Sequence, residues 1–245
     1  MDILKKAAME FDKLLPITYH FEVARRNVKK EFSLSFKPED FHHITGLHKL
    51  KDIELAQSGM RSKIYHSVLN GHIAYSDISK SNYFNEIAER LRLVGDMEKI
   101  IDSNQIIFKY LENVNRHSLI EADFLLENAH RMNIVYLFLS ERTGTSKAEA
   151  PCMFCRSLFP MDKMDYSKNQ PSYTLLKKIK TDAITGASIT QYDRKEIMAK
   201  IQKNTSEPER KSILQQLNEN KAQQAINDAL SKRATIPHKT NEHMR

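Results

Sequence analysis

The sequence predicts an α+β fold, in which N-terminal helices and a hairpin are followed by a four- to five-stranded antiparallel sheet and a helical C-terminal extension. Three observations support this prediction: a helical apolar periodicity at the N-terminus, two alternating segments after it, and a later series of short apolar runs. The chain has 245 residues, of which 40% are apolar and 28% are charged. A chain of this size and composition can bury a substantial core.

The N-terminal region has the pattern of one helix and one hairpin. Residues 2–15 carry apolar side chains at steps of three and four, and Pro16 prevents the helix from continuing. Residues 17–24 and 30–37 then alternate between polar and apolar side chains, and residues 25–29 form a polar connection. We therefore expect one face of each of these strands to pack on the core.

Helices and then strands are predicted along the middle of the chain. Pro38 fits the first turn of a helix, and residues 58–70 and 82–102 show helical periodicity. Apolar runs of strand length follow, and they begin at Ile106, Leu119, Ile134, Cys152 and Tyr173. The segments between these runs have the composition of loops, so we expect consecutive strands to pair as an antiparallel meander.

The sequence is expected to divide into three parts. Residues 1–182 form the predicted main domain, and residues 183–233 form a predicted helical extension that is polar and rich in glutamine. The long helix at 207–233 carries an apolar stripe, which must pack on the main domain, on a second copy or on another protein. Residues 234–245 contain nothing that could pack, and we expect this end to be disordered.

Charge and cysteine usage restrict the class of protein. The formal net charge is +7 and the isoelectric point is near 9.2, which favours attraction to a polyanion but is also compatible with an incidental basic surface. No segment reaches the roughly 18 consecutive apolar residues needed to cross a bilayer, and charged residues before Pro16 interrupt any signal-peptide pattern. Cys152 and Cys155 give no disulfide framework. We therefore expect a cytoplasmic protein that contacts no membrane.

The segment FHHITGLHKL, at residues 41–50, places three histidines and one lysine on a predicted amphipathic helix. On a helical wheel, His43 falls within the apolar arc and faces the core, whereas His42 and Lys49 lie together on another side. His48 points in a third direction, so we expect His42 and His48 to be solvated. A tuned histidine at His43 could transfer a proton, although a core histidine bonded to a backbone carbonyl is favoured when this helix is considered alone.

Motifs for metals and cofactors are missing from the sequence. His43 and His48 are five residues apart, no HExxH occurs, and Cys152 with Cys155 would supply only half of a zinc site. With six glycines, the chain has no Walker A loop, no GxGxxG and no GxSxG motif. We therefore expect no metal and no cofactor. The remaining chemistry is acid/base catalysis on RNA, whose 2′-hydroxyl is a built-in nucleophile. Lys or Arg side chains can stabilise the charge that accumulates on the pentacovalent phosphorus during this reaction.

Several segments together resemble a known family. Along the chain they are the hairpin, FHHITGLHKL, LLEN at 125–128, VYLFLSER at 135–142, RSLFP at 156–160 and YTLLKKIK at 173–180. This order is similar to the phage-associated branch of the Barnase/EndoU/colicin/RelE-like nucleases, specifically its fourth subfamily, and F-x-H-[IL]-x-G-L is its most specific block. The resemblance covers about residues 15–180. It implies a metal-independent ribonuclease with helices before a four-stranded antiparallel sheet, used as a toxin or effector.

The resemblance also implies site residues. It points to His43 as general base or acid, and to Ser157 and Tyr173 as groups that position or protonate the phosphate. It points to Lys177 or Arg142 as the cation that stabilises the phosphorane. Tyr173 and Lys177 are separated by an even number of residues, which predicts that both project from one face of a strand. For each of these residues except His43, an ordinary role in a strand is at least as well supported.

Two functions remain open. The first is a metal-independent RNA endonuclease, a toxin or effector of a bacterial mobile element or phage, which cleaves tRNA or mRNA by 2′-hydroxyl transesterification and binds it with His42 and Lys49. The second is a catalytically inactive regulator, for example an inhibitor encoded on a mobile element, which binds nucleic acid or protein. Residues 207–233 would then contact a protein partner or a second copy. A transferase acting on a nucleotide cofactor is a third possibility, against which the shortage of glycine-rich loops argues.

Overall fold

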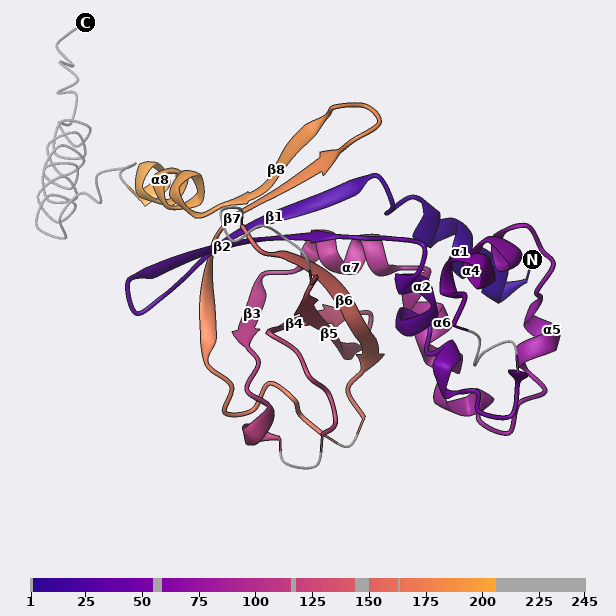
Figure 1. Cartoon of the computed structure of the whole chain (residues 1–245). Helices are drawn as coiled ribbons and strands as arrows, with labels where there is room; N and C mark the ends of the chain where they lie inside the picture. The colour runs from indigo at the N-terminus through magenta and orange to yellow at the C-terminus, as the bar shows by residue number, and fades with distance from the viewer. Residues whose placement is uncertain (1, 55–58, 116–117, 144–149, 163, 206–245) are drawn as a thin grey trace, which may run out of the picture. The chain divides into compact units, whose positions relative to one another are not determined.

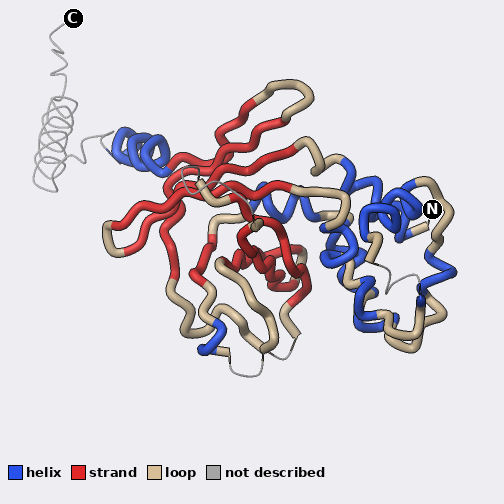
Figure 2. Tube along the Cα trace, in the orientation of Figure 1, coloured by secondary structure: helices blue, strands red, loops and turns tan. Residues whose placement is uncertain are grey.

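A computed structural model describes residues 2–54, 59–115, 118–143, 150–162 and 164–205, with side chains as far as residue 202. The chain divides into two units, Met1–Lys195 and Glu196–Arg245. The first unit contains all the strands and nearly all the helices of the described residues (Figures 1 and 2).

Seven strands form a closed barrel, and an eighth lies outside it (Figure 1). The ring runs β1-β2-β6-β5-β4-β3-β7 and closes through pairing of β7 with β1, while β8 pairs with β7 alone. Neighbouring strands are antiparallel except β2 and β6, which are parallel. The strands are β1 (Ile17–Arg25), β2 (Val28–Ser35), β3 (Ile106–Lys109), β4 (Phe124–His130), β5 (Asn133–Glu141), β6 (Cys152–Pro160), β7 (Ser172–Asp182) and β8 (Ser188–Asp193).

The barrel corrects the predicted sheet of four to five antiparallel strands, which was wrong. The five predicted runs correspond to β3, β4, β5, β6 and β7, but the N-terminal hairpin belongs to the same sheet. Strand β1 pairs with β7 from Ile17 opposite Asp182 to Ala24 opposite Thr174, and β2 pairs with β6. The hairpin thus covers both edges of the meander. Closure of this kind removes the exposed strand edges and buries one face of every strand.

Helices cluster beside the barrel, and α2 and α6 pack directly on β6 (Figure 2). The predicted helix at 2–15 is confirmed as α1, and α4 confirms most of the one at 58–70. The predicted helix at 82–102 is instead divided into the 3₁₀ turn η2 and the helices α6 and α7, which separate at Gly95 and Asp96. The helices are α1 (Ile3–Asp12), α2 (Asp40–Ile44), α4 (Arg61–Leu69), α5 (Tyr75–Ile78), α6 (Ala88–Val94), α7 (Met97–Ser103) and α8 (Arg194–Thr205), with 3₁₀ turns η1 (Leu47–Lys49), η2 (Phe84–Glu86) and η3 (Glu112–Val114).

Two hydrophobic clusters hold this arrangement together. The larger cluster fills the barrel and continues between the barrel and the helices, with Leu137 and Leu158 among its fully buried members. The smaller cluster covers the outer face of β5, where Tyr136 and Phe138 pack with Tyr110. Strand β5 is therefore buried on both faces, which explains its nearly continuous apolar sequence.

The predicted helical extension begins differently from what we expected. Its first part, Ser188–Asp193, is strand β8, which adds to β7 through an antiparallel hairpin. The predicted helix at 207–233 and the predicted disordered end at 234–245 lie outside the described residues.

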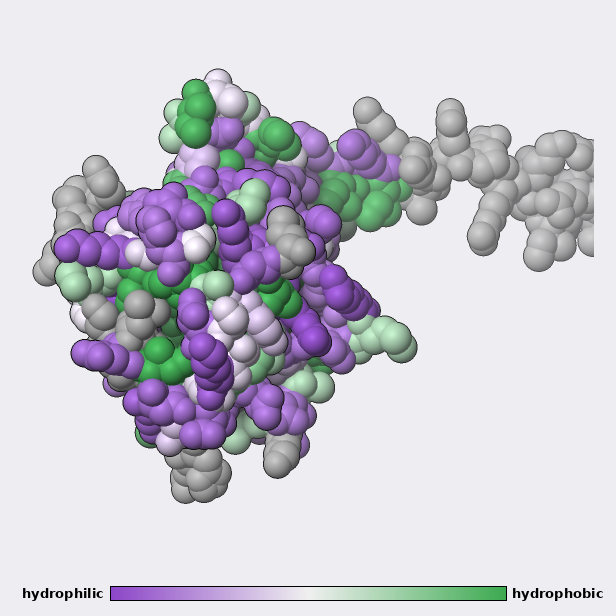
Figure 3. Space-filling model, turned by 90° about the vertical axis from the view of Figure 1, so that its right-hand side faces the viewer, coloured by the Kyte–Doolittle hydropathy of each residue, from purple (hydrophilic) through white to green (hydrophobic). Residues whose placement is uncertain are grey.

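The helical face of the molecule is covered mostly by hydrophilic residues, with hydrophobic ones gathered between them (Figure 3). Among the helices of the described residues, none combines the length and the apolar character that a membrane span requires.

Candidate active site

A large cleft opens between the helices and the outer surface of strand β6. Its volume is about 1030 Å³, and it is lined by residues of the α2–η1 segment, of η2 and α6, of β6 and of the segment 118–120, together with Asp162, Met164 and Tyr166. Side chains in it include His43, Ser157 and Lys49, which the sequence singled out.

A glycine turn places two histidines side by side. Helix α2 ends after Ile44 because Gly46 adopts a left-handed conformation, with φ of 80°, and its backbone N–H donates to the His43 carbonyl at 3.0 Å. The chain then reverses into η1, which returns His48 toward His43. The two imidazole rings lie 4.8 Å apart between centroids and tilted by 51°. Gly46 therefore accounts for the pairing of the two rings.

This turn corrects the predicted orientation of the histidines. The helical wheel assumed one continuous helix over residues 41–50, which the turn at Gly46 interrupts. His42, which we expected to be solvated, is buried with only 3% of its surface exposed. His43 and His48 are both partly exposed and line the cleft together. The expectation that His48 points away from His43 was therefore wrong.

A bulge in β6 directs two further polar side chains into the cleft. Leu139 of β5 is opposite Cys155, whereas Phe138 is opposite Ser157, so Arg156 is an extra residue. Both Arg156 and Ser157 line the cleft as a result. A regular strand would have turned one of them toward the barrel interior.

Arg90 of α6 is the most deeply buried cation of the cleft. Its side chain is 8% exposed, and its guanidinium lies 5.0 Å above the centre of the Phe159 ring. The Nη1 atom is buried and has no hydrogen-bond partner in the described part of the chain. A Cβ atom at Gly46 would lie 3.0 Å from Cδ of Arg90, so the glycine also permits the close approach of this side chain.

Burial and neighbouring cations keep the histidines neutral. Burial lowers the pKa of His43 to about 4, and the positive charges of Arg61 and Arg156 act in the same direction. Burial also lowers the pKa of His48 to about 4, with help from the charge of Arg90 and against a hydrogen bond to the His42 backbone. Two neutral imidazoles thus stand beside cationic side chains at neutral pH.

Cations lie deeper in the cleft than carboxylates do: Arg90 is buried and Lys49 and Arg156 are partly buried, whereas the three lining carboxylates, Glu86, Glu89 and Asp162, are exposed. The pKa of Lys49 is lowered by burial and by Arg90, although Glu86 lies 3.8 Å from its Nζ atom and opposes this shift. Arg156 pairs with Glu121 at 3.0 Å, and both of these side chains are partly exposed. Such exposed pairs are weak and can exchange for another anion. An anion entering the cleft would meet the guanidinium of Arg90 without displacing a carboxylate.

Arg142 supports the cleft without lining it. Its guanidinium forms a buried ion pair with Asp40 at the start of α2, and its Nη2 atom donates to the Ser35 carbonyl at 3.1 Å. Asp40 also accepts a hydrogen bond from the Lys37 backbone N–H at 2.8 Å. These contacts fix the helix that carries His43, which makes Arg142 a positioning residue in this structure.

Tyr173 and Lys177 do not join the cleft, and a bulge in β7 separates them. Val23 is opposite Leu175 and Glu22 is opposite Lys177, so the strand alternation changes phase between them. Tyr173 is 9% exposed and belongs to the core cluster that fills the barrel. Lys177 instead forms an ion pair with Asp193 of β8, with 3.8 Å between Nζ and Oδ2. The prediction of one shared strand face was wrong, because evenly spaced residues lose their common face across a bulge.

The structure thus brings together His43, Ser157 and Lys49 in the cleft, and it places Tyr173 and Lys177 elsewhere. The buried ring of His42 does not line the cleft, although its centroid lies 5.9 Å from that of His43. The structure adds Arg90, Arg156 and His48, which sequence reasoning missed as members of one site. Gly46 was the signal that could have revealed the reversal of the chain, because glycine is typical of helix ends that turn back. Within the described part of the chain, no three His, Cys, Asp or Glu side chains are grouped as potential ligands of a metal ion.

Comparison with known proteins gives one match. A family model described as phage-Barnase-EndoU-ColicinE5/D-RelE like nuclease4 matches residues 3–195, which include the whole barrel and the cleft. No curated protein matches the chain, and no solved structure matches it. Because the match spans most of the sequence, this chain belongs to the phage-Barnase-EndoU-ColicinE5/D-RelE like nuclease4 family.

Proposed function

We propose that the protein is an RNA endonuclease that works without a metal ion and cleaves RNA in the cleft beside β6. Its family is a family of nucleases, so nucleic acid is the expected class of substrate. The observation that carries the proposal is the pair of neutral imidazoles of His43 and His48, whose ring centroids lie 4.8 Å apart in the cleft. The buried guanidinium of Arg90 lines the same cleft, and its Nη1 atom has no hydrogen-bond partner in the described residues. Such a site offers proton acceptors and positive charge to a phosphodiester.

In the proposed reaction, His43 removes the proton from a ribose 2′-hydroxyl. A histidine with a pKa near 4 is almost entirely neutral at pH 7, so its ring nitrogen can accept this proton. The 2′-oxygen then forms a bond to the adjacent phosphorus, and the bond from phosphorus to the 5′-oxygen breaks. The products are a 2′,3′-cyclic phosphate and a 5′-hydroxyl.

Arg90 and Arg156 stabilise the negative charge that accumulates on the phosphate oxygens in this scheme, and Ser157 donates a hydrogen bond to one of them. His48 supplies the proton that the leaving 5′-oxygen needs. A bound phosphate anion favours the charged form of a nearby imidazole, which raises the pKa of His48 from its depressed value and allows it to carry that proton. Lys49 contacts the neighbouring phosphate of the strand.

The basic charge of the chain suits a polyanionic substrate, and a cleft of about 1030 Å³ can accept more than one nucleotide. We propose that the cellular target is tRNA or mRNA and that the protein is a toxin or effector of a phage or mobile element. Expression of the wild-type chain in bacteria should then slow growth, because loss of either RNA stops translation.

The test is cleavage of total RNA by the purified full-length chain in EDTA. We expect fragments with 2′,3′-cyclic phosphate ends, and we expect His43→Gln to lower the rate about 10²- to 10⁴-fold, since it removes a general base. His72→Gln is the matched control, because His72 is exposed and lies outside the cleft. The rate of this control should equal that of the wild type.

A wild-type chain that is folded, as judged by its thermal transition, and leaves RNA uncut would contradict the proposal. If RNA binds but stays intact in both the wild type and His43→Gln, the chain is instead a non-catalytic binder of nucleic acid. Cleavage that occurs only with added Mg²⁺ would contradict the metal-independent mechanism while leaving the nuclease function in place.

A further inference from the structure

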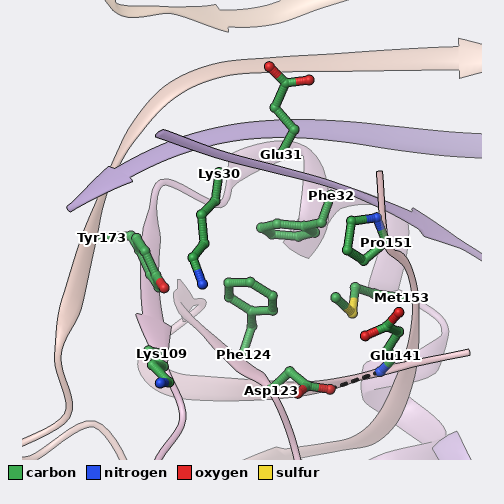
Figure 4. Close-up of a pocket in the computed structure, with 10 residues that line it drawn as sticks. All are labelled: Lys30, Glu31, Phe32, Lys109, Asp123, Phe124, Glu141, Pro151, Met153 and Tyr173. Carbon is green, nitrogen blue, oxygen red and sulfur yellow. Dashed lines mark hydrogen bonds between the residues drawn. The ribbon is translucent and has the colours of Figure 1, made fainter. Parts of the chain in front are cut away.

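A second cavity lies at one end of the barrel and shares no lining residue with the cleft. Its volume is about 360 Å³, and its walls come from strand ends: Lys109 ends β3, Phe124 begins β4 and Glu141 ends β5. Figure 4 shows these side chains, together with Lys30 and Phe32 of β2. Pockets for small ligands have volumes of roughly 300 to 1,000 Å³, so this cavity suits a ligand with one ring system.

A column of aromatic rings leads to this cavity through the barrel. Phe32 stacks on Phe21 with 4.9 Å between ring centroids, and on its other side Phe124 lies 4.3 Å away. Tyr173 lies 5.8 Å from Phe124 and is tilted by 46° to it. The regular stack therefore ends at the cavity, where Phe124 and Tyr173, which are 7% and 9% exposed, form the apolar part of the wall.

Two amines stand beside these rings. Lys30 lies two residues before Phe32 and so projects from the same face of β2, and its amine points into the space between Tyr173 and Phe124 (Figure 4). Lys109 brings a second amine to the wall. Neither amine forms an ion pair or hydrogen bond with another residue of the described part of the chain.

Two carboxylates face the same cavity. The Oδ2 atom of Asp123 accepts a hydrogen bond from the Glu141 backbone N–H at 2.9 Å, which fixes Asp123 and leaves acceptor oxygens on both side chains. Glu31 also borders the cavity, but its carboxylate points away from it (Figure 4). The two amines and two inward carboxylates have no net formal charge, so the cavity favours an uncharged ligand with donors and acceptors over a bare phosphate.

We propose that this cavity binds a single unstacked nucleobase. A nucleobase is flat, has no net charge and carries donors and acceptors on its edges. It can therefore pack against one of the two tilted rings, Phe124 or Tyr173, while its edge meets the amines and carboxylates. The base can belong to a free nucleoside or to a single-stranded nucleic acid, which share this chemistry. Binding here does not depend on the cleavage reaction proposed for the cleft.

The direct test is calorimetric titration of the full-length chain with adenosine, guanosine, cytidine and uridine. Ribose 5-phosphate is the comparison ligand, because it carries the sugar and phosphate without the base. We expect at least one nucleoside to bind in this cavity and ribose 5-phosphate not to bind there. Absence of binding by all four nucleosides at millimolar concentration would overturn the proposal, and so would binding of ribose 5-phosphate that Lys30→Met weakens as much as it weakens nucleoside binding.

Neighbouring lysines of β2 provide matched variants. Lys30→Met should weaken nucleoside binding about tenfold or more, because it removes the charged amine that donates a hydrogen bond to the edge of the base. Lys29→Met should leave binding unchanged, since Lys29 is exposed and pairs with Glu22 and Glu31. Tyr173→Leu should also weaken binding, with the thermal transition as a check of folding. Unchanged affinity in Lys30→Met would place the bound nucleoside elsewhere and refute this site.

Competition identifies the source of the base. A single-stranded oligonucleotide with 2′-O-methyl groups resists cleavage, and displacement of the nucleoside by it would assign the cavity to a base of a nucleic-acid strand. Nucleoside binding without such displacement would assign it to a free nucleoside. If nucleosides bind to a chain that cuts no RNA, the cleavage proposal fails and this one stands. If the chain cleaves RNA but binds no nucleoside, the cavity proposal fails and the cleavage proposal stands.

Discussion

Arg90 and Lys178 are both buried cations, with 8% and 1% of their surfaces exposed, but their surroundings differ. The amine of Lys178 donates to the carbonyl oxygens of Ile101, Asp102 and Asn104 at 2.8, 2.6 and 2.9 Å. All three of its donors are therefore used, and they satisfy the carbonyl end of α7. The Nη1 atom of Arg90 has no partner in the described residues and lies beside an open cleft.

The difference suggests how to separate structural from functional charge in a protein interior. A buried cation with an N–H donor that lacks a hydrogen-bond acceptor is costly, so its presence indicates a ligand that completes its hydrogen bonds. A buried cation with all its donors used stabilises the fold itself. Burial lowers the pKa of both side chains, and it lowers that of Lys178 to about 8. Arg90 nevertheless stays charged at neutral pH because an arginine hardly ever loses its proton.

Substitution of Arg90 should produce the largest effect, and the effect should be on activity. Arg90→Met keeps the apolar stem but removes the guanidinium, so we expect RNA cleavage to fall about 10²- to 10³-fold. The midpoint of thermal unfolding should stay constant or rise, since an incompletely paired charge leaves the interior. Rates of cleavage and thermal melting curves measure the two effects.

Arg92→Met is the matched control for Arg90. Arg92 lies on the same helix, but its guanidinium is exposed and pairs with Glu89 at 3.2 Å. Loss of cleavage in both variants would mean that cleavage depends on the net positive charge of the protein and not on the position of Arg90 in the cleft. A large fall in stability of Arg90→Met would mean that Arg90, like Lys178, has a structural role.

Substitution of Lys178 should affect stability instead. Lys178→Met leaves three carbonyl oxygens without their donor, so we expect the free energy of unfolding to fall by about 3 kcal/mol. Chemical denaturation at pH 7 measures this loss. The rate of RNA cleavage per folded molecule should stay close to that of the wild type, and a selective loss of cleavage would contradict the structural role of Lys178.

The pH dependence of stability should give the smallest effect. The pKa values of His43 and His48 are about 4 in the folded protein and near 6.5 when unfolded, so the unfolded chain binds more protons between these values. This contribution to stability is present above pH 6.5 and is lost as the pH falls toward 4. Both rings are partly exposed and hence screened, so we expect their share of the change to be a few degrees in the melting temperature.

The double variant His43→Gln with His48→Gln isolates this contribution from that of the carboxylates. Its melting temperature should decrease less than that of the wild type between pH 7 and pH 4.5. Identical pH dependence in the double variant and the wild type would show that the two histidines titrate alike in the folded and unfolded chains.

Much of the local structure could be predicted from the sequence. The alternation over residues 17–37 and the apolar runs after Ile106 correspond to the strands, and the periodicity of residues 2–15 corresponds to α1. The F-x-H-I-x-G-L block pointed to the nuclease family, which the family match shows. The role of His43, to which the same block pointed, stays a prediction. These successes share a cause, because a periodic pattern and a short motif depend on neighbouring residues alone.

Closure of the barrel and the membership of the cleft could not be predicted in the same way. Pairing of β1 with β7 joins segments that are far apart in sequence, and alternating residues do not specify which strand is the partner. Single extra residues had large consequences. The bulge in β6 turned Arg156 and Ser157 outward together, and the bulge in β7 separated Tyr173 from Lys177.

By itself, the sequence determined where strands and helices form, that the protein is basic, and that His43 lies in a family motif. Only the tertiary structure decided that His48, Arg90 and Arg156 line the same cleft as His43 and that Lys178 belongs to the interior. The physical reason is that the periods of helices and strands are fixed by local backbone geometry. The surroundings of a side chain depend on turns, bulges and strand partners, whose energies arise from contacts between distant segments.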